Sequence, residues 1–205
     1  MVKIIDISME IKEGMIFYPG DPEIKIKKYL SIPKDPVNLS TLNFGSHTGT
    51  HIDSGLHIKK KGRSTSKLPL NSFYGKCKVL DLTKAGKEIK KQHLEKYNLE
   101  KDDIVLLKTQ NSKKQYNKFR KDFTHISEEA AEYLAEKKIK TIGVDYLSVS
   151  KFNTKNKVHE ILIKNMTVFE GLNLSKVKQG EYIFAGLPLK INCDGAPARV
   201  ILIKN

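Results

Sequence analysis

Cysteine is scarce in this chain of 205 residues, which has only Cys77 and Cys193. The two do not form a C-x-x-C pair, so the sequence excludes a thiolate zinc finger and a small disulfide-stapled scaffold. A chain of this length can bury about 70% of the surface that its unfolded form exposes, and it needs no covalent staple. Unpaired cysteines are typical of proteins in the reducing cytoplasm, where we expect this one.

Long apolar runs are absent as well. No stretch of the sequence approaches the roughly 20 consecutive apolar residues that a membrane-spanning helix requires. The first six residues, Met1 to Asp6, end in an acid and lack the apolar core of a signal peptide. We therefore expect neither a membrane partner nor a secretion signal.

Arginine is rare, although the chain is strongly basic. Lys and Arg total 37 against 23 Asp and Glu, a net charge of +14, yet only three of the 37 are arginine. A basic balance suggests nucleic-acid binding, but arginine is the residue that makes bidentate contacts to bases and phosphates. The lysines are spread along the chain, and the dense run Lys59–Lys61 has no interleaved aromatic residue. The composition favours a solvated lysine surface and predicts no nucleic-acid partner.

Several common catalytic signatures are also missing. The sequence contains no P-loop and no G-x-G-x-x-G segment, which excludes the usual phosphate-binding loops. It contains no G-x-S-x-G elbow either. Gly45 and Gly49 have the right spacing for that elbow, but His47 occupies its central position.

The apolar pattern predicts one α/β domain with a mixed sheet over residues 1–205. Ser127 followed by two glutamates predicts a helix start, because a hydroxyl caps the first turn and carboxylates favour the positive end of the helix dipole. Strands 78–82 and 104–109 are expected to be buried on both faces, and strand 24–29 on one. The remaining strands are expected at 3–7, 39–44, 139–145, 166–169, 182–185 and 200–203, and helices at 89–97, 127–138 and 158–164.

The most informative segment holds three of the six histidines, His47, His51 and His57, within eleven residues that also include Asp53. Imidazole and carboxylate groups suit Zn²⁺ or Mn²⁺, and no thiolate is present to make the site purely structural. Asp53 has two carboxylate oxygens and could bridge two ions. The residues alone leave His57 open as a third ligand, a catalytic base or a support for a ligand.

A regular element cannot bring these groups to one ion. Four residues of strand span roughly 13 Å, whereas one turn of helix brings residues 47 and 51 together but rotates Asp53 away. We therefore expect the chain to bend within the segment, and Gly45, Gly49 and Gly55 permit such a bend.

The segment H-T-G-T-H-I-D-S-G-L-H at 47–57 resembles the H-x-G-T-H-x-D-x-P-x-H signature of the metal-dependent cyclase / kynurenine formamidase family. The likeness continues in order along nearly the whole chain. It covers I-D-I-S with Y-P-G-D, V-L-L-K-T, G-V-D-Y-L-S-V, and L-P-L-K-I with D-G-A-P-A-R, at 5–8, 18–21, 105–109, 143–149, 187–191 and 194–199.

The resemblance implies a swivelling β/β/α fold, a homodimer or larger homo-oligomer, and two divalent ions, Zn²⁺ or Mn²⁺. His47, His51 and Asp53 would hold the first ion. Asp53 would bridge to a second ion completed by His159 and Glu170, two residues that spacing alone leaves unremarkable.

The resemblance also implies roles around the ions. His57 would be the catalytic acid and base, and Phe17 and Tyr18 would help to wall the substrate pocket. Tyr18 replaces a frequent tryptophan and Gly55 replaces the signature's proline. Two further departures are Tyr146 for threonine and Gln110 for glycine.

Taken together, the sequence predicts a metal-dependent amide hydrolase acting on a small molecule. The family likeness implies an arylformamidase that cleaves N-formyl-L-kynurenine to kynurenine and formate by means of a metal-bound hydroxide. Three alternatives stay open: a hydrolase of another cyclic or N-acyl amide, a metal-binding scaffold without catalysis, and a nucleic-acid-binding protein that would account for the charge.

Overall fold

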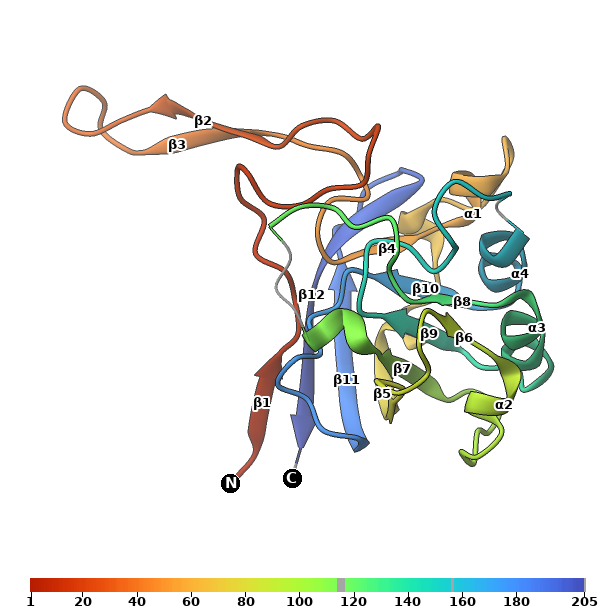
Figure 1. Cartoon of the computed structure of the whole chain (residues 1–205). Coiled ribbons are helices and arrows are strands. Elements are labelled where there is room, and N and C mark those ends of the chain that lie inside the picture. The colour runs from red at the N-terminus through yellow and green to blue at the C-terminus, as the bar shows by residue number, and fades with distance from the viewer. Residues whose placement is uncertain (114–116, 156, 205) are drawn as a thin grey trace.

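A computed structural model describes residues 1–113, 117–155 and 157–204 of the chain (Figure 1). Its main sheet has eight strands in the order β1-β12-β11-β5-β7-β9-β10-β4. Because β4 also pairs with β12, all of these strands except β1 close into a barrel. The strands are β1 (Lys3–Asp6), β4 (His51–Asp53), β5 (Tyr74–Asp81), β7 (Ile104–Lys108), β9 (Thr141–Val144), β10 (Thr167–Glu170), β11 (Gly180–Pro188) and β12 (Gly195–Lys204).

The sheet is mixed, as predicted. Strands β5, β7, β9 and β10 are parallel neighbours, whereas β1, β4, β11 and β12 pair antiparallel. Three helices, α2 (Lys91–Leu94), α3 (Glu128–Glu136) and α4 (Lys157–Asn165), lie on the outer side of the parallel strands (Figure 1). The predicted α/β class with a mixed sheet is confirmed.

Two apolar cores lie on opposite faces of the parallel strands. In β7, Ile104 and Leu106 point into the barrel with Phe169 and Phe184, while Val105 and Leu107 face the helices. All four β7 residues are fully buried. A strand covered on both faces has no polar side to present, which is why its sequence is a continuous apolar run.

Helix α3 begins where the sequence predicts, because the backbone N–H of Ala130 donates to the Ser127 hydroxyl at 3.2 Å. It ends at Glu136, before the expected residue 138. Lys138 adopts a left-handed conformation with φ of 55°. That backbone geometry cannot continue a right-handed helix.

The helix predicted over 89–97 forms only at Lys91–Leu94. Ile89 instead belongs to the short strand β6 (Glu88–Ile89), which pairs with β8 (His125–Ile126), and only the single turn of α2 follows. Ile89 is buried against Ile126 in a separate two-stranded sheet, so tertiary pairing overrides the four-residue periodicity. Other short helical pieces are α1 (Gly55–Ile58), η1 (Thr65–Lys67), η2 (Leu70–Phe73) and η3 (Gln110–Lys113).

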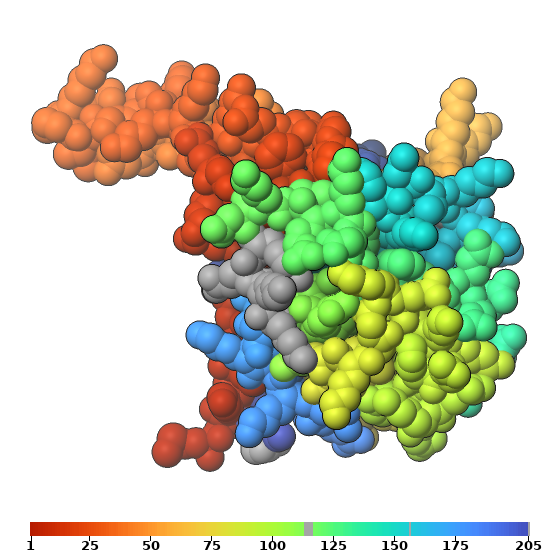
Figure 2. Space-filling model, in the orientation of Figure 1, coloured from red at the N-terminus to blue at the C-terminus, as the bar shows by residue number. Residues whose placement is uncertain are grey.

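A hairpin of β2 (Lys25–Leu30) and β3 (Leu39–Asn43) projects from the body as an arm (Figures 1 and 2). The strands are where the sequence predicts them, but the expected burial of one face of strand 24–29 holds only in part: Ile24 is buried and Ile26 is half-buried. Tyr29 is 69% exposed and Leu42 is 62% exposed. Within the described residues the two strands pair only with each other, and most of their side chains are exposed.

The described helices reach at most nine residues. None of them is long and apolar enough to cross a membrane.

Candidate active site

The histidine segment enters the barrel as β4, a strand of three residues held between β10 and β12. Ile52 at its centre points into the inner core. His51 and Asp53 therefore point to the opposite face, since successive strand residues alternate. On the neighbouring strand Glu170 is the direct partner of His51, so strand register places these two chemical groups together.

The bend expected within the histidine segment is present just before β4, and one of the three candidate glycines makes it. Gly49 adopts φ of 66°, while Gly45 and Gly55 do not have positive φ. The buried Thr50 then fixes the start of the strand, because its hydroxyl donates to the Gly171 carbonyl and accepts from the Met9 N–H at 2.8 Å. The bend brings His47 back over β4.

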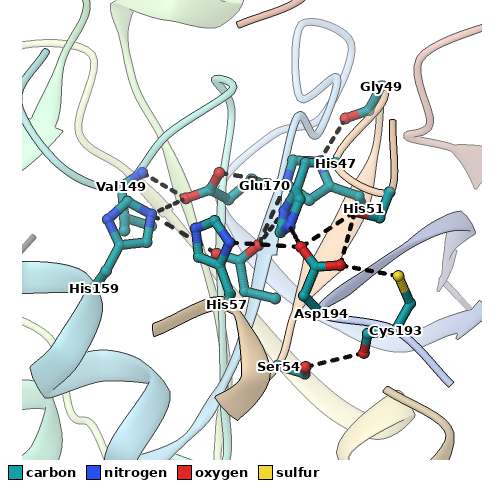
Figure 3. Close-up of polar contacts among 12 residues, drawn as sticks. His47, Gly49, His51, Ser54, His57, Val149, His159, Glu170, Cys193 and Asp194 are labelled. Atoms are coloured by element: carbon teal, nitrogen blue, oxygen red, sulfur yellow. Dashed lines mark hydrogen bonds and ion pairs between the residues drawn. The ribbon is translucent and has the colours of Figure 1, made fainter. Parts of the chain in front are cut away.

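All five predicted metal-site residues come together. Figure 3 labels four of them, His47, His51, His159 and Glu170. His51 Nε2 lies 3.5 Å from both Asp53 Oδ1 and Glu170 Oε2. His159 on α4 places its Nε2 3.1 Å from Glu170 Oε1 and 3.7 Å from Asp53 Oδ2. His47 Nδ1 lies 2.8 Å from Asp53 Oδ1. Asp53 thus faces all three imidazoles.

Buried polar atoms in this cluster lack ordinary partners. Asp53 is 2% exposed and His51 1%. His51 Nε2 and both carboxylate oxygens of Asp53 make no hydrogen bond, although ionic neighbours lie close. An unsatisfied buried polar group costs about 1–3 kcal/mol. A cation would satisfy all three atoms, and His51, Asp53 and Glu170 can each offer one ligand atom within 4.8 Å of the others. The donor set fits a divalent metal.

The ionisation of the buried Asp53 and His51 also favours a bound cation. Burial alone would raise the pKa of Asp53, but its contacts with His47 and His51 hold that pKa well below the ordinary value. Burial would likewise lower the pKa of His51, yet Asp53 and Glu170 raise it to about 10. Buried carboxylates that stay ionised demand positive charge nearby. Protons on the histidines meet that demand, and a metal ion that replaced them would release those protons.

Two imidazoles of the cluster, those of His51 and His159, are each oriented by a group outside the cluster. His51 Nδ1 donates to the Gly49 carbonyl at 3.0 Å, and His159 Nδ1 lies 2.6 Å from the Ser150 hydroxyl. Both contacts leave Nε2 aimed at the carboxylates, which is the usual arrangement around a metal-ligating histidine. The sequence analysis did not identify Ser150, because nothing in its spacing relates it to His159.

A cavity of about 380 Å³ opens beside the cluster, and its walls include His47, His51, His57, His159 and Glu170. Tyr18 lines it as predicted and packs against Phe119, with ring centroids 5.1 Å apart. Phe17 is half-buried and is not one of the lining residues. Lining residues that the sequence analysis did not single out include Asp21, Ser148, Ser150 and Lys151.

His57 is carried by α1 and faces this cavity, with a side chain 31% exposed. Its ring centroid lies 4.2 Å from that of His47 and 5.7 Å from that of His159. Burial lowers the pKa of His57. One ring nitrogen could also join His47 and Asp53 around an ion, so the geometry is compatible with both a ligand and a base.

The departures from the family signature have structural explanations. A side chain at position 55 would place its Cβ 2.9 Å from the Arg63 backbone nitrogen, so glycine permits a close backbone contact. The Tyr146 hydroxyl accepts from the Arg120 N–H at 2.7 Å, and its ring stacks on Phe123. The Gln110 amide donates to the Gly86 carbonyl at 2.9 Å. Tyr146 and Gln110 are not among the cavity-lining residues.

Comparisons with known proteins give relatives over nearly the whole chain. The family model described as "Putative cyclase" matches residues 5–151. The kynurenine formamidase of Salinibacter ruber is 31% identical over 204 residues, covering 97% of this chain and 96% of that protein. A solved structure described as a potential metal-dependent hydrolase with cyclase activity has a TM-score of 0.89 at 35% identity, covering 100% of this chain and 99% of the other. Isatin hydrolase A from Labrenzia aggregata shares the fold, with a TM-score of 0.86 at 21% identity, covering 98% of this chain and 93% of the other.

Substitution of the central carboxylate tests the cluster directly. We expect Asp53→Asn to lose both ions, because one side chain faces all three imidazoles and supplies the charge that holds them. Metal content per chain, measured by mass spectrometry after dialysis, should be about two for the parent protein. Asp21→Asn, in the same cavity but outside the cluster, should keep that content. Full metal content in the Asp53 variant would contradict a bridging role.

Proposed function

The chain belongs to the cyclase family, and on that premise we propose that it is a metal-dependent arylformamidase that hydrolyses N-formyl-L-kynurenine to kynurenine and formate. The observation that carries the proposal is the convergence of three histidines on Asp53 and Glu170 beside a cavity. The similarity to kynurenine formamidases along 97% of the chain supports this substrate over other amides.

The residues would divide between two ions. His47, His51 and Asp53 would hold the first, and Asp53 would share the second with His159 and Glu170. Either Zn²⁺ or Mn²⁺ suits this set of nitrogen and oxygen ligands. A divalent ion bound there supplies a Lewis acid and lowers the pKa of water in its shell from 15.7 to about 7.

His57 is the proton carrier in this proposal. Its ring faces the cavity beside His47 and His159, where a formamide carbon must sit to be attacked. His57 takes the proton of the attacking water and returns it to the leaving aniline nitrogen as the C–N bond breaks. The aryl group of the substrate would pack on Tyr18, which is itself held by Phe119 and Phe152.

The first test is hydrolysis of N-formyl-L-kynurenine by the purified protein, monitored by the absorbance of the kynurenine product. We expect activity that disappears after chelation and returns with Zn²⁺ or Mn²⁺, because the buried carboxylates need the cation. Failure of fully metal-loaded protein to release formate would overturn the formamidase assignment and leave the metal site standing. The same assay with cyclic amides such as isatin would then identify the other class of substrate.

Replacement of His57 separates its two possible roles. We expect His57→Ala to lower kcat/KM about 10²–10⁴-fold, the usual range for loss of a general acid and base, while metal content stays at the parent level. His93→Ala, on a helix outside the cavity, is the histidine control and should leave kcat/KM unchanged. If His57→Ala loses metal along with activity, the residue is a ligand and the assigned role is wrong.

We also propose that two copies of the chain assemble through the arm. An isolated two-stranded hairpin is marginally stable in water, and this one carries exposed apolar side chains that a monomer rarely leaves uncovered. They are Tyr29, Ile32, Val37, Leu39 and Leu42, each at least 49% exposed. Asp21 and His47, at the two ends of the segment that forms the arm, line the cavity. A second copy seated on the arm would therefore support the rim of the site.

Analytical ultracentrifugation tests this assembly. The chain has a mass of 23.3 kDa, and we expect the parent protein to sediment with twice that mass. Leu39→Asp combined with Leu42→Asp should sediment as a monomer, because charge on the arm opposes burial. Leu70→Asp changes an exposed leucine on the body, 76% exposed, and should leave the dimer intact. A monomeric parent protein, or a dimeric arm variant, would refute the arm interface.

Two broader assignments complete the proposal. Residues 1–205 would act as one domain, supported by the pairing of β1 with β12 from opposite ends of the chain. The cytoplasm would be its compartment, supported by two free cysteines, Cys77 and Cys193.

A further inference from the structure

Asp194 contacts His47 of the metal cluster from outside the cluster. Its Oδ2 lies 2.8 Å from His47 Nε2 (Figure 3). The Ser46 hydroxyl donates to the same carboxylate at 3.2 Å, and the Cys193 thiol donates to Oδ1 at 2.9 Å. The Oδ2 atom therefore faces the site, where it contacts a single proposed ligand, His47, and lies 4.0 Å from His57 Nδ1.

His47 lies between two carboxylates. Its Nδ1 faces Asp53 Oδ1 at 2.8 Å and its Nε2 faces Asp194 Oδ2 at 2.8 Å. A neutral imidazole offers a lone pair on one nitrogen and a proton on the other. If Nε2–H donates to Asp194, the Nδ1 lone pair is directed toward Asp53 and the cluster. His51 and His159 show the opposite choice, with Nδ1 bonded outward and Nε2 inward.

The backbone around Asp194 is fixed by the signature segment itself. The Ser54 N–H donates to the Asp194 carbonyl at 2.9 Å, and the Ser54 hydroxyl donates to the Cys193 carbonyl at 3.3 Å. The Thr65 N–H donates to the same Cys193 carbonyl at 3.0 Å. Asp194 is thus held in place by hydrogen bonds that do not depend on its side chain.

Gly195 provides a second, independent constraint on the same imidazole. It pairs with Asp53 where β12 closes the barrel on β4. A Cβ at this position would lie 2.6 Å from His47 Cε1 and 2.7 Å from Nε2, closer than real Cβ contacts allow. The bare backbone of Gly195 therefore forms the surface on which the ring of His47 rests.

We propose that Asp194 and Gly195 are positioning residues for His47: the carboxylate selects the tautomer that presents Nδ1 to the metal, and the glycine leaves room for the ring. The inference rests on the proposed metal-dependent function, but it concerns ion binding and not the substrate. Loss of such an outer partner typically weakens metal affinity 10–100-fold. The affected ion would be the one held by His47, His51 and Asp53.

Competition with a chelator, using Zn²⁺ as the probe, measures the two affinities per chain. We expect Asp194→Ala to weaken one of the two Zn²⁺ sites 10–100-fold and to leave the other near its parent value. Cys193→Ala is the matched control, because it removes a donor to the same carboxylate but keeps the contact with His47. It should bind both ions as the parent does. Equal affinities in Asp194→Ala and the parent protein would overturn the proposal.

Two further measurements distinguish positioning from a general structural effect. The visible absorption of the Co²⁺-loaded protein should change in Asp194→Ala, since the ligand geometry changes, while the urea midpoint of the metal-free variant should match that of Cys193→Ala. An unchanged spectrum, or a metal-free variant that unfolds at markedly lower urea, would contradict a positioning role. Asp194→Asn keeps the shape and one acceptor, so it should restore part of the affinity.

Gly195→Ala tests the second constraint on the His47 ring by placing a methyl group against it. It should weaken the same Zn²⁺ site, because the added methyl group displaces the ring, and parent-like affinity in a folded Gly195→Ala protein would refute its part in the proposal.

The formamidase assay separates this inference from the proposed function. A parent protein that binds two ions but does not hydrolyse the formamide contradicts the function alone, whereas unchanged ion binding in Asp194→Ala contradicts the positioning role alone.

Discussion

The burial of two ionised carboxylates on neighbouring strands is the constraint on which the rest of the site depends. Asp53 and Glu170 are 2% and 3% exposed, and each raises the energetic cost of ionising the other. Charges so placed are tolerated only when they are paired. Three imidazoles surround them, and each imidazole comes from a different local structure: a bent loop, a strand and a helix. The fold brings the loop before β4, strand β4 and helix α4 together around the two carboxylates.

The strand pairing that closes the barrel also assembles the site. Strand β4 has three residues, and its pairing with β10 and β12 joins the two ends of the curved sheet. That pairing places His51 opposite Glu170 and Gly195 opposite Asp53. Ile52, fully buried in the inner core, anchors β4 by the hydrophobic effect between two polar ligands. A strand so short has few hydrogen bonds of its own, so the apolar anchor and the buried Thr50 matter for the register.

The sequence allowed the main-sheet strands other than β4, the two strands of the arm, the capped helix α3 and the histidine segment to be predicted, because these depend on local pattern. The short strands β4, β6 and β8 were not predicted. His159 and Glu170 could be assigned only through family likeness, since a helix and a strand register bring them to Asp53 over more than a hundred residues of sequence. The helix expected at 89–97 is limited to α2, because Ile89 pairs with Ile126 of β8 in place of continuing the helix. Strand 24–29 was expected to be buried on one face, which holds for Ile24 but not for Tyr29. Alternation in a sequence does not show how far along a strand a second layer extends.

The proposed ligands and the proposed acid and base differ in how firmly they are held. His47, His51 and His159 each have an outer partner that fixes one ring nitrogen: Asp194, the Gly49 carbonyl and Ser150. Within the described residues the ring of His57 makes no hydrogen bond, and its Nδ1 lies 4.0 Å from Asp194 Oδ2. A ligand gains from a fixed tautomer, whereas a group that accepts and returns a proton must use both protonation states. The absence of a fixed partner at His57 is therefore what its proposed chemistry requires, and the same feature at any of the other three histidines would weaken ion binding.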